Sequence, residues 1–272
     1  MKKLILYIVL TMLLGVMFFF GSKAYKQAIL YEEATTELVS YKDAGQQASL
    51  KLEQFAKSLF GDLYDDELKM KLDKVREKQE VAMLKAQEYT VYFMGVLAVV
   101  LLSFFLVSLR TLTLFGSLSA MMTRILGLIT PILMVTIHKE VEYLGDIVLS
   151  FESKGVIGSI VKLWETGDII VAVVILLFSV VVPVLKVLSL LIVSIFMESR
   201  FAHGIITFFK MIGKWSMVDV FVVAVFLVYL TANKGDVSRA EVEMGLYFFL
   251  AYVIVSMLVS LSADKMLHKL KA

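Results

Sequence analysis

Six apolar runs divide the chain, and polar stretches separate them. A helix that crosses a bilayer needs about 17–25 mostly apolar residues, so runs near this length predict membrane spans. The pattern therefore predicts an all-α polytopic bundle of about six spanning helices. The predicted spans are Leu4–Phe20, Val91–Leu109, about Ala120–Ile137, Asp168–Phe196, Met217–Thr231 and Gly245–Ser262.

The third run is the least regular, because Arg124 interrupts it. One interpretation begins the span at about Ala120 and places Arg124 near its inner end. The alternative lays Leu112–Thr123 along the inner membrane surface before the chain turns into the bilayer. Residues 91–119 are then the second span with a cytoplasmic connector.

The first run follows Lys2 and Lys3, a pattern that signal peptides share. Ser22-Lys23-Ala24 is only a poor cleavage site, and the helical pattern continues past it without a break. An uncleaved N-terminal anchor over residues 1–22 is the favoured prediction, and a cleaved signal peptide is the alternative.

A polar insertion over residues 23–90 separates the first two spans. Residues 23–88 hold 11 Lys/Arg and 13 Asp/Glu, which places them outside the bilayer. Apolar residues recur there at helical spacing, with a break at Gly61–Asp66 where glycine and aspartate suit a helix end and a new start. An antiparallel helical hairpin is expected, as a spacer or homodimerising coiled coil, or as a docking site for a partner. Its stripes are Leu38, Tyr41, Ala48, Leu52, Phe55 and Leu59, then Leu68, Leu72, Val75 and Ala82.

Composition agrees with the membrane class. Hydrophobic residues make up 59% of the 272 residues and the mean hydropathy is +0.83, whereas soluble domains are about 45–50% apolar. The net charge of +2 does not favour a nucleic-acid partner. The chain has no cysteine, which excludes disulfides, thiolate zinc sites and thiol nucleophiles.

Basic residues orient the bundle, because cytoplasmic ends of spans are enriched in Lys and Arg. Both termini are expected inside, with residues 266–272 as a cytoplasmic tail and the hairpin outside. The basic residues at the cytoplasmic ends are Lys2, Lys3, Arg110, Arg124, Arg200, Lys210, Lys214, Lys265, Lys269 and Lys271.

Catalytic motifs are missing from the sequence: it has no GxxxxGK[ST], HExxH or GxSxG. His138, His203 and His268 fall at span ends or in loops, where solvation is a better explanation than metal binding. The chain is therefore predicted not to be an enzyme and to need no metal or other cofactor.

Polar residues inside the fourth span are the strongest functional signal. Lys186 lies within an apolar run from Ile169 to Phe196 that contains no other charge. An ammonium at a helix centre costs on the order of 2.5–3.5 kcal/mol, so such a residue usually faces a partner or a wet cavity. Ser179, Pro183 and Lys186 are spaced to share one helix face. The alternative is that Lys186 snorkels to the membrane surface.

The start of the fifth span carries a second polar pair, Ser216 and Asp219, which are i, i+3 neighbours. They are candidate binding residues, or alternatively a helix cap stabilised by the helix dipole. Whether Asp219 pairs with Lys186 is left open by the sequence. Pro131 and Pro183 both lie in apolar runs and are predicted to mark helix kinks.

Two motifs carry a family resemblance. They are Phe178-Ser179-Val180-Val181-Val182-Pro183-Val184-Leu185-Lys186 and Gly213-Lys214-Trp215-Ser216-Met217-Val218-Asp219-Val220-Phe221. Together they resemble the paraquat-inducible protein A family, over about residues 120–265, as one four-helix module. Better known members carry two modules and cysteine-rich zinc ribbons, whereas this chain has one module and no cysteine.

The resemblance implies an inner-membrane partner of MCE-domain proteins, which form lipid tunnels across the periplasm. It also implies that Ser179, Lys186 and Ser216 line a polar pocket that handles membrane lipid, with Asp219 as counter-charge or proton carrier. One alternative is a sensor or scaffold that acts through the hairpin. Another is a proton-coupled exporter, for which Asp219 is the one plausible titrating carboxylate and no second module forms an inverted repeat.

Overall fold

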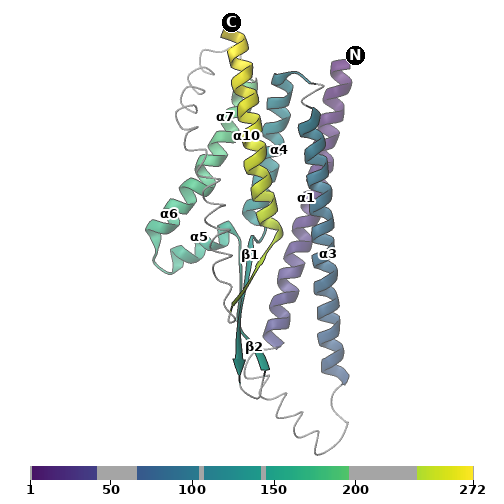
Figure 1. The fold of residues 1–272 in the computed structure, drawn as a ribbon, viewed down its shortest axis with the longest axis vertical. Helices are drawn as coiled ribbons and strands as arrows, with labels where there is room; N and C mark the ends of the chain where they lie inside the picture. Colours follow the sequence, from purple (N-terminus) through teal and green to yellow (C-terminus); the bar gives the residue numbers. More distant parts are fainter. Residues whose placement is uncertain (1, 42–65, 104–106, 142–144, 196–237, 272) are drawn as a thin grey trace, which may run out of the picture.

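The computed structural model describes residues 2–41, 66–103, 107–141, 145–195 and 238–271. Five helices in these ranges are long and apolar enough to cross a membrane, which confirms a polytopic helical bundle. α1 begins and α10 ends at one end of the bundle, and a small sheet lies at the other (Figure 1). The spanning helices are α1 (Lys2–Tyr41), α3 (Asp66–Leu102), α4 (Leu109–Ile129), the continuous α6–η2–α7 segment (Ile169–Ile195) and α10 (Met244–Lys271).

α1 and α3 form a long antiparallel pair that extends past the ends of the other spans (Figure 1). The amide Nε2 of Gln79 donates to Thr35 Oγ1 at 2.8 Å in the extended part, and Tyr31 packs with Ala82 and Met134. The described parts of the predicted hairpin, residues 23–41 and 66–88, are helical and run on from the first two spans. The tip, residues 42–65, lies outside the described residues.

α4 corrects the prediction for the third span, because the helix begins at Leu109 and ends at Ile129 rather than running over 120–137. Ser108 caps its start by accepting the Thr111 amide. Thr130 at its end is extended, the conformation that a following proline favours. Pro131, predicted to kink a span, lies beyond this cap and ends the helix. The stretch predicted as a connector or a surface helix is therefore the first half of a spanning helix.

The remaining spans follow the sequence more closely. Asp168 precedes α6 and α7 ends at Ile195, as predicted for the fourth span, and α10 contains the predicted sixth span. α3 ends at Leu102, so the second span stops before the predicted Leu109. The predicted fifth span, Met217–Thr231, lies outside the described residues.

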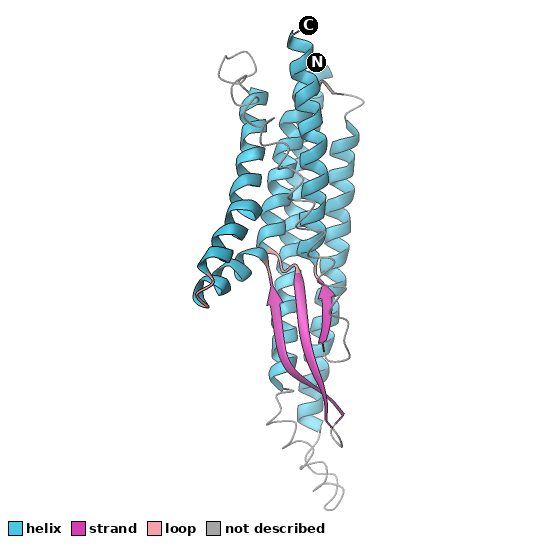
Figure 2. Ribbon diagram, turned by 60° about the vertical axis from the view of Figure 1, so that its left-hand side comes forward, coloured by secondary structure: helices cyan, strands magenta, loops and turns pink. Residues whose placement is uncertain are grey.

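A three-stranded antiparallel sheet extends the bundle at the end away from the termini (Figure 2). It consists of β1 (Leu133–Val141), β2 (Gly145–Lys154) and β3 (Ser238–Val242) in the order β2-β1-β3. Met134 pairs with Ser153 on one side and with Glu241 on the other. The first five residues of β1, Leu133–Ile137, were predicted as the end of the third span, and no strand was predicted anywhere, so the sheet corrects that end and adds to the predicted helical bundle.

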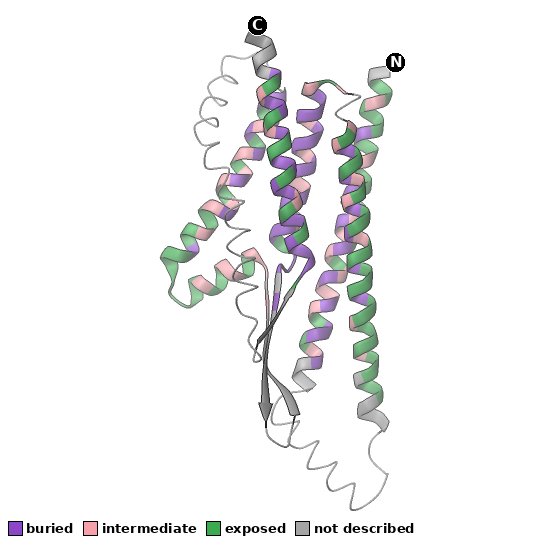
Figure 3. Ribbon diagram, viewed as in Figure 1, coloured by how far each residue is buried: buried purple, intermediate pink, exposed green. Residues whose placement is uncertain are grey.

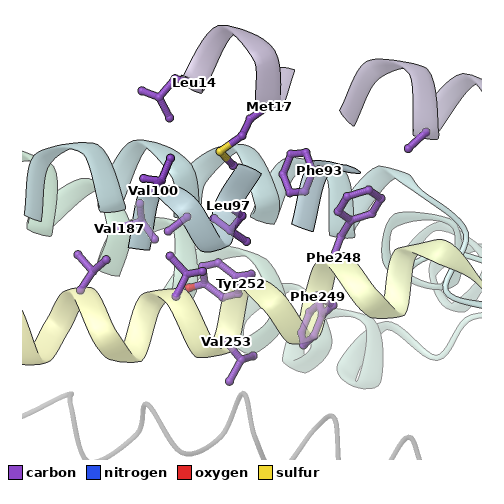
Figure 4. Close-up of a cluster of buried hydrophobic side chains, with 14 of the residues drawn as sticks. Leu14, Met17, Phe93, Leu97, Val100, Val187, Phe248, Phe249, Tyr252 and Val253 are labelled. Carbon is purple, nitrogen blue, oxygen red and sulfur yellow. The ribbon is translucent and has the colours of Figure 1, made fainter. Parts of the chain in front are cut away.

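The core lies where α1, α3, α4 and α10 meet, and α4 is the most enclosed of these helices (Figure 3). Phe93 of α3 and Phe248 of α10 contact edge to face with ring centroids 5.1 Å apart (Figure 4). Glycines let α4 and α10 approach closely: a Cβ on Gly116 would lie 2.6 Å from Val259 Cγ2. Small residues at such contacts are typical of helix packing in membranes.

Candidate functional site

The fourth predicted span, which carries Ser179 and Lys186, is not a regular α-helix. α6 (Ile169–Leu176) passes into a π-helical turn, η2 (Leu177–Val181), and then into α7 (Val182–Ile195). The amide of Val182 donates to the carbonyl of Leu177, five residues back. Pro183 follows directly and has no N–H for the Ser179 carbonyl. A π turn in a helix is often found at functional sites.

The buried face of this span includes Ser179, Pro183 and Val187. Lys186 is half-buried and lies beside that face rather than at its centre. The π turn adds residues to one turn of helix, so the 3.6-residue spacing that placed Ser179 and Lys186 in one stripe does not hold across it. The carbonyl of Lys186 accepts the Ser189 hydroxyl at 2.6 Å.

Tyr252 ties the irregular span to α10. Its hydroxyl donates to the Pro183 carbonyl oxygen at 3.3 Å, and the side chain is fully buried in the core (Figure 4). A buried tyrosine hydroxyl normally has such a partner. The bond fixes α7 to α10 one turn before Lys186.

Arg124 is a second buried cation that sequence analysis misplaced. It was assigned to the cytoplasmic end of the third span, yet it lies five residues before the sheet end of α4 and is 0% exposed. Its guanidinium carbon is 4.6 Å from the ring centroid of Phe249 and 4.7 Å from that of Tyr252. Cation–π contacts of this kind stabilise a desolvated cation by about 2 kcal/mol or more. An arginine inside an apolar run was itself the signal for an interior position.

Arg110 lies at the other end of α4 from Arg124 and fixes the last turn of α7. Its Nε donates to the Ser194 carbonyl and its Nη2 to the Ile195 carbonyl, each at 3.0 Å. The Ser194 hydroxyl donates back to the Arg110 carbonyl at 3.1 Å. A cation at a helix C-terminus is favoured by the helix dipole. α7 is thus fixed to its neighbours at its last turn and at Pro183.

The structure places Ser179 and Pro183 on the buried face of one span and Lys186 at the edge of that face. Tyr252 bonds to Pro183, and Arg124 lies against the Tyr252 ring. Ser216 and Asp219 lie outside the described residues, so their roles and the Lys186–Asp219 pairing stay predictions. Two pockets in the described part of the chain measure about 480 and 300 Å³. Neither is lined by Ser179 or Lys186: the first borders Tyr7 and Thr11, and the second lies beside Glu32.

Comparison with known proteins supports the resemblance carried by the two motifs. The family described as Paraquat-inducible protein A matches residues 146–268, so the resemblance is confirmed over that segment. The chain is 30% identical over 115 residues to the Intermembrane transport protein PqiA of Escherichia coli (strain K12), and equally to that of Shigella flexneri. Each match covers 40% of this chain and 27% of the relative's length. No solved structure matches the chain.

Proposed function

We propose that the protein is an inner-membrane subunit that handles phospholipid for transport between membranes. Lipid meets the α6–η2–α7 span from the side, and its headgroup reaches Lys186 near the middle of the bilayer. The observation that carries the proposal is a lysine in a largely exposed, irregular span within residues 146–268, the segment that the Paraquat-inducible protein A family matches.

The exposure of this span supports lateral access. Only 17% of its most apolar 18-residue stretch is buried, whereas 61% of the corresponding stretch of α4 is buried. Val174 and Leu185, on either side of the π turn, are 47% and 51% exposed. A spanning helix with exposed apolar side chains presents them to lipid. Lys186 lies at the edge between that surface and the buried face.

The chemistry of Lys186 suits a phosphate headgroup. An ammonium is a compact charge that binds phosphate oxygens as a point charge. Because water is scarce at this depth, the attraction is stronger than at a protein surface. In this proposal Ser179 and Ser216 add hydroxyls, and Asp219 neutralises Lys186 when no lipid is bound.

The proposed arrangement places both termini in the cytoplasm and the sheet and α1–α3 extension in the periplasm. An MCE-type protein is the partner expected there, and it would take lipid onward from the bundle. The similarity covers 27% of the relative's length, so this partnership is part of the proposal.

The test is a pulse–chase of radiolabelled phospholipid between the two membranes of cells that lack the protein and carry a variant. The native chain and Lys265→Ala, which removes an exposed lysine of α10, are expected to restore the transfer rate. Lys186→Ala is expected to fail although it is inserted in the membrane at a normal level. Full transfer by Lys186→Ala would reject the proposed role of the lysine.

The α1–α3 extension favours a second candidate, a scaffold that docks a partner outside the membrane. The extended part is held by its own packing and by the Gln79–Thr35 hydrogen bond. In the same cells this function predicts normal transfer by Lys186→Ala and loss when the extension is shortened.

A further inference from the structure

α5 (Val156–Glu165) marks the level of a membrane surface. It begins where two spans end: a Cβ on Gly155 would lie 3.5 Å from the Thr130 carbonyl oxygen, and the Gly245 amide donates to the Pro131 carbonyl at 2.8 Å. The helix runs across the bundle axis rather than along it (Figure 1). The ends of α4, α5 and α10 therefore lie at one depth.

The exposed face of α5 carries large apolar side chains. Ile157, Val161 and Trp164 are 45%, 50% and 56% exposed, and Lys162 and Glu165 are exposed beside them. The exposed apolar surface continues into α6 at Ile169 and Ile170. A short helix with an exposed tryptophan face next to a span is typical of the bilayer interface. The headgroups of surrounding lipids are expected at this level.

A cavity of about 300 Å³ opens at the same level, between α1 and the start of α5. Leu128, Ile129 and Ile157 form apolar walls, whereas Glu32 of α1 and Ser153 of β2 are polar. The Ser153 hydroxyl is buried and has no hydrogen-bond partner among the described residues. Walls of both kinds at a membrane surface fit an amphiphilic ligand.

The charges of the cavity fit a zwitterionic headgroup. The Glu32 carboxylate attracts an ammonium, and one carboxylate with one hydroxyl is too few oxygens for a calcium ion. The first turn of α5 also borders the cavity, and no side chain caps this helix at Gly155. Uncapped amides at a helix N-terminus attract phosphate.

We propose that this cavity binds the headgroup of an amine-bearing phospholipid, with its ammonium at Glu32 and its phosphate at the start of α5 and the Ser153 hydroxyl. The acyl chains then leave along Ile129 and Ile157, which are 39% and 45% exposed. The site combines α1 with a segment that resembles the transport family and contains none of the residues around Lys186. A lipid that stays bound satisfies this inference, so it does not rest on the proposed function.

The experiment measures retained lipid on the full-length chain in nanodiscs made from equal parts of phosphatidylethanolamine, phosphatidylglycerol and phosphatidylcholine, followed by native mass spectrometry. The native chain is expected to retain phosphatidylethanolamine preferentially. Glu32→Gln should lower that preference about fivefold, as expected for a partly exposed ion pair. Ser153→Ala should lower it less. Glu33→Gln, an exposed neighbour on the same helix, should leave it unchanged.

The inference would be overturned by an equal lipid distribution on the native chain, by an unchanged preference in Glu32→Gln, or by an equal loss in Glu33→Gln. Soluble glycerophosphoethanolamine is expected not to displace the lipid, and displacement would show a site for a free zwitterion instead. Lys186→Ala should keep the preference, which separates this site from the proposed function.

Discussion

The hydroxyl of Tyr252 donates to the carbonyl oxygen of Pro183 across 3.3 Å, joining α10 to α7 immediately after the π turn. The ring of the same tyrosine lies 4.7 Å from the guanidinium carbon of Arg124. One side chain therefore links three spans: the central α4, the C-terminal α10 and the irregular span that carries Lys186. This junction holds the span of the proposed lipid site against α4 and α10.

Tyr252→Phe is expected to separate the two contacts, because it removes the hydrogen bond and keeps the ring beside Arg124. The loss should be about 0.5–1.5 kcal/mol of unfolding free energy, the range for a hydrogen bond between membrane helices. Tyr252→Leu also removes the cation–π contact and should cost more. Thermal unfolding in detergent measures both, with exposed Tyr247→Phe as the control. Equal midpoints for Tyr252→Phe and the native chain would show that the bond contributes nothing.

Gly127 should tolerate no side chain, because α4 meets the α10 backbone there. A Cβ at this position would lie 3.0 Å from the Phe249 nitrogen and 3.1 Å from its Cα, and a backbone does not move aside as a side chain does. Gly127→Ala is expected to cost about 1–3 kcal/mol. Gly95→Ala is the matched control, since nothing lies within 4 Å of its added carbon. The control should be neutral or up to about 1 kcal/mol stabilising; similar unfolding midpoints for the two variants would contradict this packing.

Arg110 should hold the last turn of α7 through its two hydrogen bonds to the Ser194 and Ile195 carbonyls. Arg110→Lys keeps the charge but not the planar pair of donors, so a partial loss is expected. Arg110→Ala should cost about 1 kcal/mol and raise hydrogen exchange at the end of α7. Exchange that stays unchanged in both variants would show that the two hydrogen bonds of Arg110 do not hold this turn.

Of the six predicted spans, hydropathy alone located the first, second, fourth and sixth, and the fifth lies outside the described residues. The third shows why hydropathy misplaced it. α4 is central, so its buried Ser, Thr and Arg residues contact protein instead of lipid, and its mean hydropathy of 1.6 is lower than the 2.9 of Ile169–Ile195 and the 2.2 of Met244–Met266. Arg124 was interpreted as the end of a span because an interior partner cannot be seen in a sequence. The rings of Phe249 and Tyr252 come from a helix more than 120 residues later.

The sheet could not be predicted for a related reason. β3 (Ser238–Val242) pairs with β1 (Leu133–Val141) across about a hundred residues, and five residues carry little local signal of their own. The π turn was also missed, although Pro183 within an apolar run indicated some irregularity at that point. The motifs that carry the resemblance did locate the segment that the comparisons match.

The most direct test of the central claim is the amount of phospholipid that co-purifies with the full-length chain, measured per mole of folded protein. Native protein, Lys186→Arg and Lys265→Ala are expected to retain phosphate-bearing lipid beyond the share held at Glu32. Lys186→Ala should bind that lipid about tenfold more weakly, as expected for loss of a charged hydrogen-bond donor. Equal lipid on Lys186→Ala and the native chain would contradict a headgroup site at this lysine.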